Sequence, residues 1–291
     1  MITLENAFIK AQFQEKGAEL ISLYSLSHQL EYLWSGDSQY WGRHAPVLFP
    51  VVGRLKDDTY TYQGKEYSLG QHGFARDKEF TVVEKSAHHV VFQLTSSPET
   101  LAVYPFAFVL RIRYQLLAAQ LTVTYEVVNP SKKQALVFGL GAHPAFRVPL
   151  KAGETFRDYQ LTAKPQETYQ QLALVAPYLD LEQARTFDFT QPVSLASELF
   201  AEDTLILATP EKTAFTLVNP KTHLGVEVAF EGFPFTGFWT ANPEKMPFVC
   251  IEPWCGIADT LDASGDFSEK FGNNILEPEK DFQRSFTIGI L

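Results

Sequence analysis

FVLRIRY at residues 108–114 and LTVTYEVV at residues 121–128 decide the fold class of this chain. In both segments apolar and polar side chains alternate, which is the period of a β-strand with one buried face. The stretch VVFQL at residues 90–94 has the same β-branched and aromatic character, and Gln63-Gly64 and Asn129-Pro130 mark turns between such segments. Strands do not alternate with long helical patterns. The sequence therefore predicts an all-β protein of antiparallel sheets, a sandwich or a barrel, and not a Rossmann or TIM-barrel fold.

Helical periodicity is scarce in the rest of the chain. The sequence predicts only short helices, at residues 38–42, 97–103 and 181–184, the last because Leu and Ala stand beside charged residues there. It also predicts a hairpin from Tyr60 to Tyr67, turning around residues 63–65.

The length of the chain allows two domains or one large β architecture. With 291 residues, 45% of them hydrophobic, the protein can bury a large core. No Pro-, Ser- or Gly-rich spacer, low-complexity tract or block of like charges marks a boundary. We therefore expect one domain over residues 1–291.

Charge and cysteine usage narrow the possible partners. The formal net charge of −10 argues against binding nucleic acid or an anionic membrane, because both need clustered Lys and Arg to neutralise phosphate. Cys250 and Cys255 are the only cysteines, so we expect no disulfide framework and a reducing, cytoplasmic location. The N-terminal residues have neither a basic start nor a long apolar run, and no stretch of about eighteen apolar residues occurs, which predicts neither export nor a membrane span.

The densest cluster of polar residues and glycines runs from residue 44 to residue 76. It contains Gly53-Arg54 and then QHGFAR at residues 71–76. Gly73 allows close backbone approach or a positive φ, so His72 and Arg76 flank a sharply shaped loop of the kind that often presents functional side chains. A solvated turn with salt-bridging arginines would have the same sequence. The functional interpretation of His72 rests on the suitability of imidazole for proton transfer near pH 7.

Two further segments carry groups suited to proton transfer. In FGLGAHPAF, residues 138–146, an apolar strand ends in glycines and delivers His143, which Pro144 pushes toward extended geometry. A buried His that donates to a carbonyl would look the same. Glu252 closes the apolar run PFVCIE at residues 247–252, where desolvation would raise its pKa toward that of a base that works near neutrality. A structural ion pair with Arg54 or Arg76 is the alternative for this carboxylate.

Two other kinds of site have to be weighed against acid–base chemistry. His72, His143 and Glu252 together have the composition of a zinc or iron site. Their spacing does not support it, because no two histidines stand at the helical separations of three or four residues. A Ser-His-Asp hydrolase has less support still, since there is no G-x-S-x-G motif to place a nucleophile. We expect neither a metal nor a cofactor.

At these clusters the sequence resembles the aldose 1-epimerase family, most closely its LacX-like branch, near the hexose-6-phosphate epimerases. The likeness spans nearly the whole chain. Its motifs are GAELISL at 17–23, APVLFP at 45–50 with GR at 53–54, HGFAR at 72–76, GAHPAF at 141–146 and IEPW at 251–254. Several motifs in order form a specific signal, although each alone would be weak.

The resemblance implies a large antiparallel β-supersandwich whose open face holds a sugar, and it implies roles for individual residues. Glu252 matches the family's catalytic base, which takes the proton of the C1 hydroxyl. His143 matches the acid that protonates the ring oxygen. His72 and Arg54 match positions that hold the sugar hydroxyls and the ring oxygen, and Arg76 matches a position in the ligand site of the phosphate-using branch.

The resemblance is weaker on the remaining points of the site. Asp203, within FAEDTL at 200–205, is the best positional match to a further acidic sugar-binding residue. GAHP at 141–144 stands where galactose mutarotases usually carry an Asn-His pair, so a preference for galactose is not implied.

The sequence thus predicts an aldose 1-epimerase that interconverts the anomers of a hexose or hexose phosphate. A carbohydrate-binding or sugar-sensing protein on the same scaffold is the alternative, and a metal-dependent β-barrel enzyme is a third possibility. The expected partner is a small sugar, and the chain is expected to be a monomer or a homodimer.

Overall fold

The two segments that predict the fold form adjacent strands, β10 (Val109–Leu117) and β11 (Gln120–Val128), in the computed structural model, which describes residues 1–291. They pair antiparallel along their whole length, with Leu117 opposite Gln120. Their buried side chains alternate with exposed or half-buried ones, as the period of two requires. One face of this hairpin therefore packs into a core while the other lies toward solvent.

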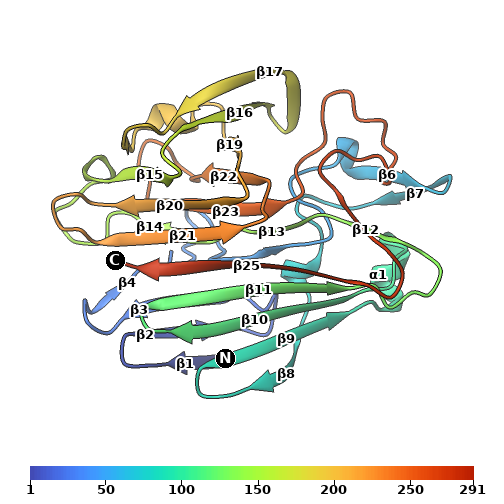
Figure 1. Ribbon diagram of the computed structural model, residues 1–291, viewed down its shortest axis with the longest axis horizontal. Helices are drawn as coiled ribbons and strands as arrows, with labels where there is room; N and C mark the ends of the chain where they lie inside the picture. Colours follow the sequence, from blue (N-terminus) through green and yellow to red (C-terminus); the bar gives the residue numbers. More distant parts are fainter.

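These strands belong to a nine-stranded sheet, which forms the front layer in Figure 1. Its order is β18 (Val193–Ser194), β15 (Gln160–Lys164), β20 (Lys212–Val218), β21 (Gly225–Glu231), β25 (Asp281–Ile290), β11, β10, β9 (His89–Thr95) and β8 (Thr81–Lys85). The C-terminal strand β25 thus joins strands from two separate regions of the chain.

An eight-stranded sheet forms the second large layer. Its order is β17 (Tyr178–Asp188), β16 (Thr168–Val175), β19 (Leu205–Ala208), β22 (Phe235–Trp239), β23 (Phe248–Cys255), β13 (Leu140–Ala142) and β5 (Val47–Leu48), with β14 (Ala145–Arg147) also paired to β23. All pairings between the named strands of both sheets are antiparallel. The all-β antiparallel architecture predicted from the sequence is confirmed.

Smaller sheets and a few helical turns complete the fold. The small sheets are β1 (Ile2–Glu5), β2 (Ile9–Phe13), β3 (Leu20–Ser25) and β4 (Leu30–Glu31); β6 (Thr59–Tyr62) and β7 (Lys65–Ser68); and β12 (Leu136–Phe138) and β24 (Asn274–Leu276). The helical segments are α1 (Pro98–Val103) and 3-10 turns at Lys56–Asp58, Ala75–Asp77, Phe156–Asp158 and Ser197–Phe200. No helix is long and apolar enough to span a bilayer.

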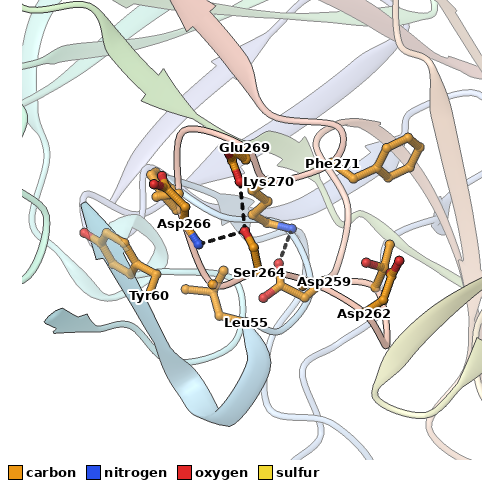
Figure 2. Close-up of a pocket in the computed structure, with 13 residues that line it drawn as sticks. Leu55, Tyr60, Asp259, Asp262, Ser264, Asp266, Glu269, Lys270 and Phe271 are labelled. Atoms are coloured by element: carbon orange, nitrogen blue, oxygen red, sulfur yellow. Dashed lines mark hydrogen bonds and ion pairs between the residues drawn. The ribbon is translucent and has the colours of Figure 1, made fainter. Parts of the chain in front are cut away.

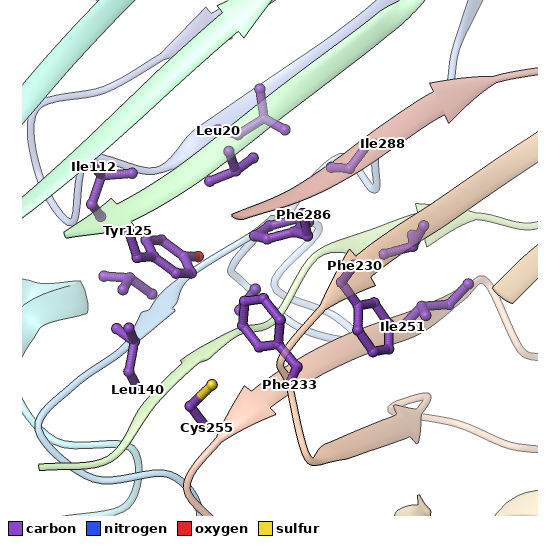
Figure 3. Close-up of a cluster of buried hydrophobic side chains, with 14 of the residues drawn as sticks. Leu20, Ile112, Tyr125, Leu140, Phe230, Phe233, Ile251, Cys255, Phe286 and Ile288 are labelled. Atoms are coloured by element: carbon purple, nitrogen blue, oxygen red, sulfur yellow. The ribbon is translucent and has the colours of Figure 1, made fainter. Parts of the chain in front are cut away.

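Apolar side chains from the two large sheets meet in one core. Figure 3 shows Tyr125 and Phe286 of the nine-stranded sheet facing Leu140 and Ile251 of the eight-stranded sheet. Each large apolar side chain that is fully buried in this way contributes roughly 1.5–3 kcal/mol to folding. The packing leaves the opposite face of the eight-stranded sheet free to build a site.

Two of the three predicted helices are wrong, and the hairpin is confirmed. Residues 97–103 form α1, with Ser97 as the N-cap residue. Residues 38–42 form a non-helical turn, and residues 181–184 lie within strand β17, where pairing with β16 overrides a local helical preference. In the hairpin, Gln63 and Gly64 have φ values of 50° and 75°, and β6 and β7 pair on either side of them.

Candidate active site

The predicted base, Glu252, lies on strand β23, all of whose residues are buried. Its odd-numbered residues, such as Ile251, pack into the core between the sheets. Its even-numbered residues Cys250, Glu252 and Trp254 therefore lie on the opposite face, since successive side chains of a strand alternate. Only 1% of Glu252 is exposed.

His143 reaches this carboxylate because the strands on either side of it both pair with β23. Gly141 of β13 lies opposite Trp254, and Ala145 of β14 lies opposite Cys250. The residues that connect β13 and β14 must therefore run beside Glu252. Nε2 of His143 lies 3.3 Å from Oε2 of Glu252. Both side chains are buried, so their contact is shielded from solvent.

Two tryptophan rings hold the imidazole of His143 in place. The ring stacks on Trp41, with 4.8 Å between centroids, and meets Trp239 edge to face at 5.6 Å. The floor beside it is Trp254, and glycines make room for that ring: a Cβ at Gly237 would collide with it. The glycines that the sequence shows around these strands thus allow a bulky aromatic floor.

His72 lies in the sharp turn that the sequence predicts. His72 and Gly73 both have positive φ, 65° and 68°, and a Cβ at Gly73 would collide with the carbonyl oxygen of Phe49. The backbone N–H of Gly53 donates to Nδ1 of His72 at 3.0 Å, and the His72 N–H donates to the Gly53 carbonyl at 2.8 Å. Because Nδ1 accepts, a neutral ring carries its proton on Nε2 and can donate from there.

The two predicted arginines do not pair with Glu252, so the structural alternative weighed for that carboxylate is wrong. Arg54 approaches Asp58, with 3.6 Å between Nη1 and Oδ2. Arg76 donates from Nη2 to the carbonyl of Gln71 at 2.7 Å, while its buried Nε has no hydrogen-bond partner in the protein. Both guanidinium groups keep donors available for a ligand.

Asp203 also lies in this region. It sits in the turn before β19 with a φ of 75° and accepts a hydrogen bond from Nε1 of Trp239 at 2.9 Å. That bond links the carboxylate to the tryptophan that flanks His143. The presence of Asp203 in the site was expected from the family resemblance alone.

The structure gathers all six predicted site residues in the wall of one cavity of about 370 Å³. The six are Arg54, His72, Arg76, His143, Asp203 and Glu252. Cavities of roughly 300–1,000 Å³ are typical of small-molecule sites. Sequence reasoning did not assign Gln71, Leu174, Pro177, Thr204 and Ile206, which also line it. Gln71 and Thr204 adjoin predicted residues, but nothing local to the sequence marks Leu174, Pro177 or Ile206.

Burial shifts the pKa values of Glu252 and His143 in opposite directions. The pKa of Glu252 is raised well above its usual value because the carboxyl is desolvated, and the negative charge of Asp203 raises it further. The pKa of His143 is lowered by desolvation and by the positive charge of Arg76. The pKa of His72 is also lowered, first by burial, then by electrostatic interaction with His143 and with nearby arginines. The uncharged forms of all three groups are favoured.

Figure 2 shows a second, smaller cavity of about 180 Å³, whose lining residues Leu55 and Asp259 directly follow Arg54 and Ala258 of the first cavity. Its lining includes the buried ion pair of Lys270 and Asp259, with 2.9 Å between Nζ and Oδ1. The Asp259 backbone N–H donates to the carbonyl of Arg54, and its carboxylate accepts from the backbone N–H of Lys56. The pair therefore fixes the turn that carries Arg54 and belongs to the support of the larger cavity.

Comparisons with known proteins place this chain in a family. The family described as aldose 1-epimerase matches residues 1–288. The plasmid-encoded Protein LacX of Lactococcus lactis subsp. lactis is 31% identical, over 100% of this chain and 99% of the relative. The chain belongs to the aldose 1-epimerase family.

Solved structures of galactose mutarotase-related proteins share the fold over the full chain. A galactose mutarotase related enzyme from Lactobacillus acidophilus has a TM-score of 0.96 and 39% identity, covering 100% of this chain and 97% of the other. A galactose mutarotase-like protein from Lactobacillus casei ATCC 334 has a TM-score of 0.90 and 34% identity, with both chains covered completely. The galactose mutarotase-like supersandwich expected for this epimerase-family chain is confirmed.

Proposed function

We propose that this protein is an aldose 1-epimerase that interconverts the α and β anomers of a hexose or hexose phosphate. The observation that carries the proposal is the 3.3 Å approach of Glu252 and His143 in a buried cavity of small-molecule size. The two oxygens that exchange protons in mutarotation, the C1 hydroxyl and the ring oxygen, are bonded to the same carbon. One base and one acid side by side can therefore serve both.

The proposed reaction needs proton transfer only. Glu252 takes the proton of the C1 hydroxyl while His143 gives a proton to the ring oxygen, and the C1–O5 bond opens. Rotation about C1–C2 exposes the other carbonyl face, and the two transfers reverse to close the ring. Each well-placed proton-transfer group typically accelerates such a step by about 10²–10⁴-fold.

The rest of the cavity wall is proposed to hold the sugar. Nε2–H of His72 and the guanidinium of Arg54 donate to hydroxyls and the ring oxygen, and Asp203 accepts from a hydroxyl. Trp41 and Trp239 offer apolar ring faces to the C–H side of the sugar. Arg76 also lines the cavity, where its guanidinium is proposed to contact a phosphate or another anionic substituent.

The test is anomer exchange, followed by polarimetry or by exchange NMR on freshly dissolved α-glucose, α-galactose and glucose 6-phosphate. We expect acceleration of at least one sugar by the wild type and its loss in His143→Asn. Saturable binding without acceleration of any of these sugars would favour a sugar-sensing protein and contradict the proposal. Equal acceleration by wild type and His143→Asn would remove His143 from the mechanism.

A further inference from the structure

Cys250 lies beside the proposed acid–base pair. It precedes Glu252 by two residues on β23, so the two side chains share a face of the strand. One ligand atom from each of His143, Cys250 and Glu252 can be chosen so that all three lie within 4.8 Å of one another, and all three residues are buried. Oε2 of Glu252 accepts no hydrogen bond from the protein despite its burial. An imidazole nitrogen, a thiol sulfur and a carboxylate oxygen thus lie close together in a buried place.

We propose that His143, Cys250 and Glu252 form a binding site for a divalent ion of the zinc class, and that its occupancy inhibits the enzyme. The inhibitory half of this inference rests on the proposed function; the binding half does not. Zinc prefers these three donor types, and sites with three protein ligands keep a fourth position open. The metal triad considered from the sequence had His72 in place of Cys250; His72 lines the same cavity, but its ring nitrogens are not among the close-lying ligand atoms.

The distances suit a tetrahedral ion. Zinc–ligand bonds of about 2.0–2.3 Å separate neighbouring ligand atoms by roughly 3.5 Å. The 3.3 Å between Nε2 of His143 and Oε2 of Glu252 already meets this requirement. One ligand atom of each residue lies within 4.8 Å of the other two, so reaching the separations of a tetrahedral site requires each pair to close by little more than 1 Å at most. His143 and Glu252 line the large cavity, so an ion enters from it and its fourth position faces it.

The chemistry of binding needs no change of oxidation state. The thiol proton of Cys250 leaves to solvent as the zinc–sulfur bond forms, and a proton held by Glu252 leaves as its oxygen becomes a ligand. A carboxylate and an imidazole bound to the ion can no longer exchange protons with a sugar. Magnesium and calcium prefer sets of oxygen ligands and should not bind here.

The chain provides its own matched control. Cys255 is the other cysteine, lies on the same strand and is also buried. It packs in the core between the sheets and donates from Sγ to the carbonyl of Gly232 at 3.4 Å. Removal of the Cys255 thiol should leave zinc binding unchanged, whereas removal of the Cys250 thiol should weaken it.

The first experiment is inhibition of anomer exchange by zinc chloride in the full chain, comparing wild type, Cys250→Ser and Cys255→Ser. We expect inhibition of the wild type that is competitive with sugar, with magnesium chloride having no effect. Cys250→Ser should retain turnover but need at least about 10–100-fold more zinc for the same inhibition, since even the loss of a group that only orients a ligand costs this much, while Cys255→Ser should match the wild type. Equal zinc sensitivity of Cys250→Ser and wild type would overturn the proposal.

The second experiment measures binding without activity. Cobalt(II) bound to a thiolate gives a near-ultraviolet charge-transfer absorption, so titration with cobalt chloride should produce this band in wild type and Cys255→Ser but not in Cys250→Ser. Cys250→Ala, checked by circular dichroism, replaces Cys250→Ser if serine disturbs the strand. A band in a protein that epimerises no sugar would support the site and refute the proposed function. A band that persists in Cys250→Ser, or its absence from the wild type, would refute the site.

Discussion

Replacement of Glu252 by Gln is expected to stop turnover while leaving the fold intact. The amide keeps the shape of the side chain in the buried strand β23 but cannot take a proton from a sugar hydroxyl. Loss of a general base typically costs about 10²–10⁴-fold in rate, which corresponds to roughly 3–5 kcal/mol of transition-state stabilisation. No other carboxylate is hydrogen-bonded or ion-paired with His143, so none is placed to substitute directly.

The same substitution should raise stability in a pH-dependent way. Burial raises the pKa of the folded Glu252 carboxyl above its usual value of 4.5. The unfolded wild-type chain therefore loses this proton at a lower pH than the folded chain does, so the wild type loses stability as pH rises from 4.5 toward the folded-state pKa. Gln has no proton to lose. The difference in Tm between Glu252→Gln and wild type should thus grow in favour of the variant between about pH 4 and about pH 7.

The assay for Glu252→Gln combines polarimetry on fresh α-anomers with thermal melts at both pH values. Glu231→Gln is the control, because that carboxylate is 60% exposed at the end of β21 and pairs with Lys212, remote from the cavity wall. It should change neither rate nor Tm. Turnover of Glu252→Gln within about threefold of the wild type would refute the base assignment, and an unfolded variant would refute the account of its burial.

Three further predictions follow from the same structure. The catalysed rate should be greatest while Glu252 and His143 share one proton, so kcat/KM should fall at low pH as the imidazole is protonated, below its usual 6.5, and at high pH as the carboxyl, with its raised pKa, ionises. Lys270→Met should lower the free energy of unfolding in urea by about 3–5 kcal/mol, because it leaves the buried Asp259 without its partner. Arg76→Met should raise KM for glucose 6-phosphate by about 10–100-fold, the loss of one charged hydrogen bond, and leave KM for glucose nearly unchanged.

Each of these predictions has an outcome that contradicts it. A catalysed rate that rises with pH throughout, after subtraction of the uncatalysed reaction, would show that protonated Glu252 has no role. An unchanged urea midpoint in Lys270→Met would mean that Asp259 is not held by this ion pair. Equal changes in KM for glucose and glucose 6-phosphate in Arg76→Met would assign Arg76 to the sugar ring and not to phosphate.

The strand architecture could be predicted from the sequence because a period of two is a local signal. The hairpin of β10 and β11 follows directly from alternation at residues 108–128. Residues 181–184 show the limit: their composition favours a helix, yet pairing between β16 and β17 extends them. The order of strands in the sheets, such as β25 between β21 and β11, depends on contacts between distant segments that no local pattern contains.

The candidate site was predictable where chemistry and backbone geometry coincide in sequence. Glu252 in an apolar run and His143 between glycines and a proline are unusual combinations, and the structure brings these two together. The approach of Cys250 could not be read in this way, because a cysteine in a buried strand is ordinary. Its significance depends on which face of β23 it occupies and on the connection between β13 and β14, which places His143 over that face.

The protonation of the buried pair bears on how the proposed catalysis works. Burial favours the uncharged carboxyl of Glu252 and the uncharged imidazole of His143, so the empty site holds its proton on the carboxyl. In the proposed mechanism the same arrangement arises when the ring has opened, after Glu252 has gained a proton and His143 has lost one. Ring opening thus starts from ionised Glu252 with protonated His143, the charged pair, and ends with both groups uncharged, the neutral pair. The two states differ only in which group holds one proton, and the two atoms concerned are 3.3 Å apart. The desolvated cavity therefore favours the neutral pair that accompanies the open-chain sugar over the charged pair from which ring opening starts.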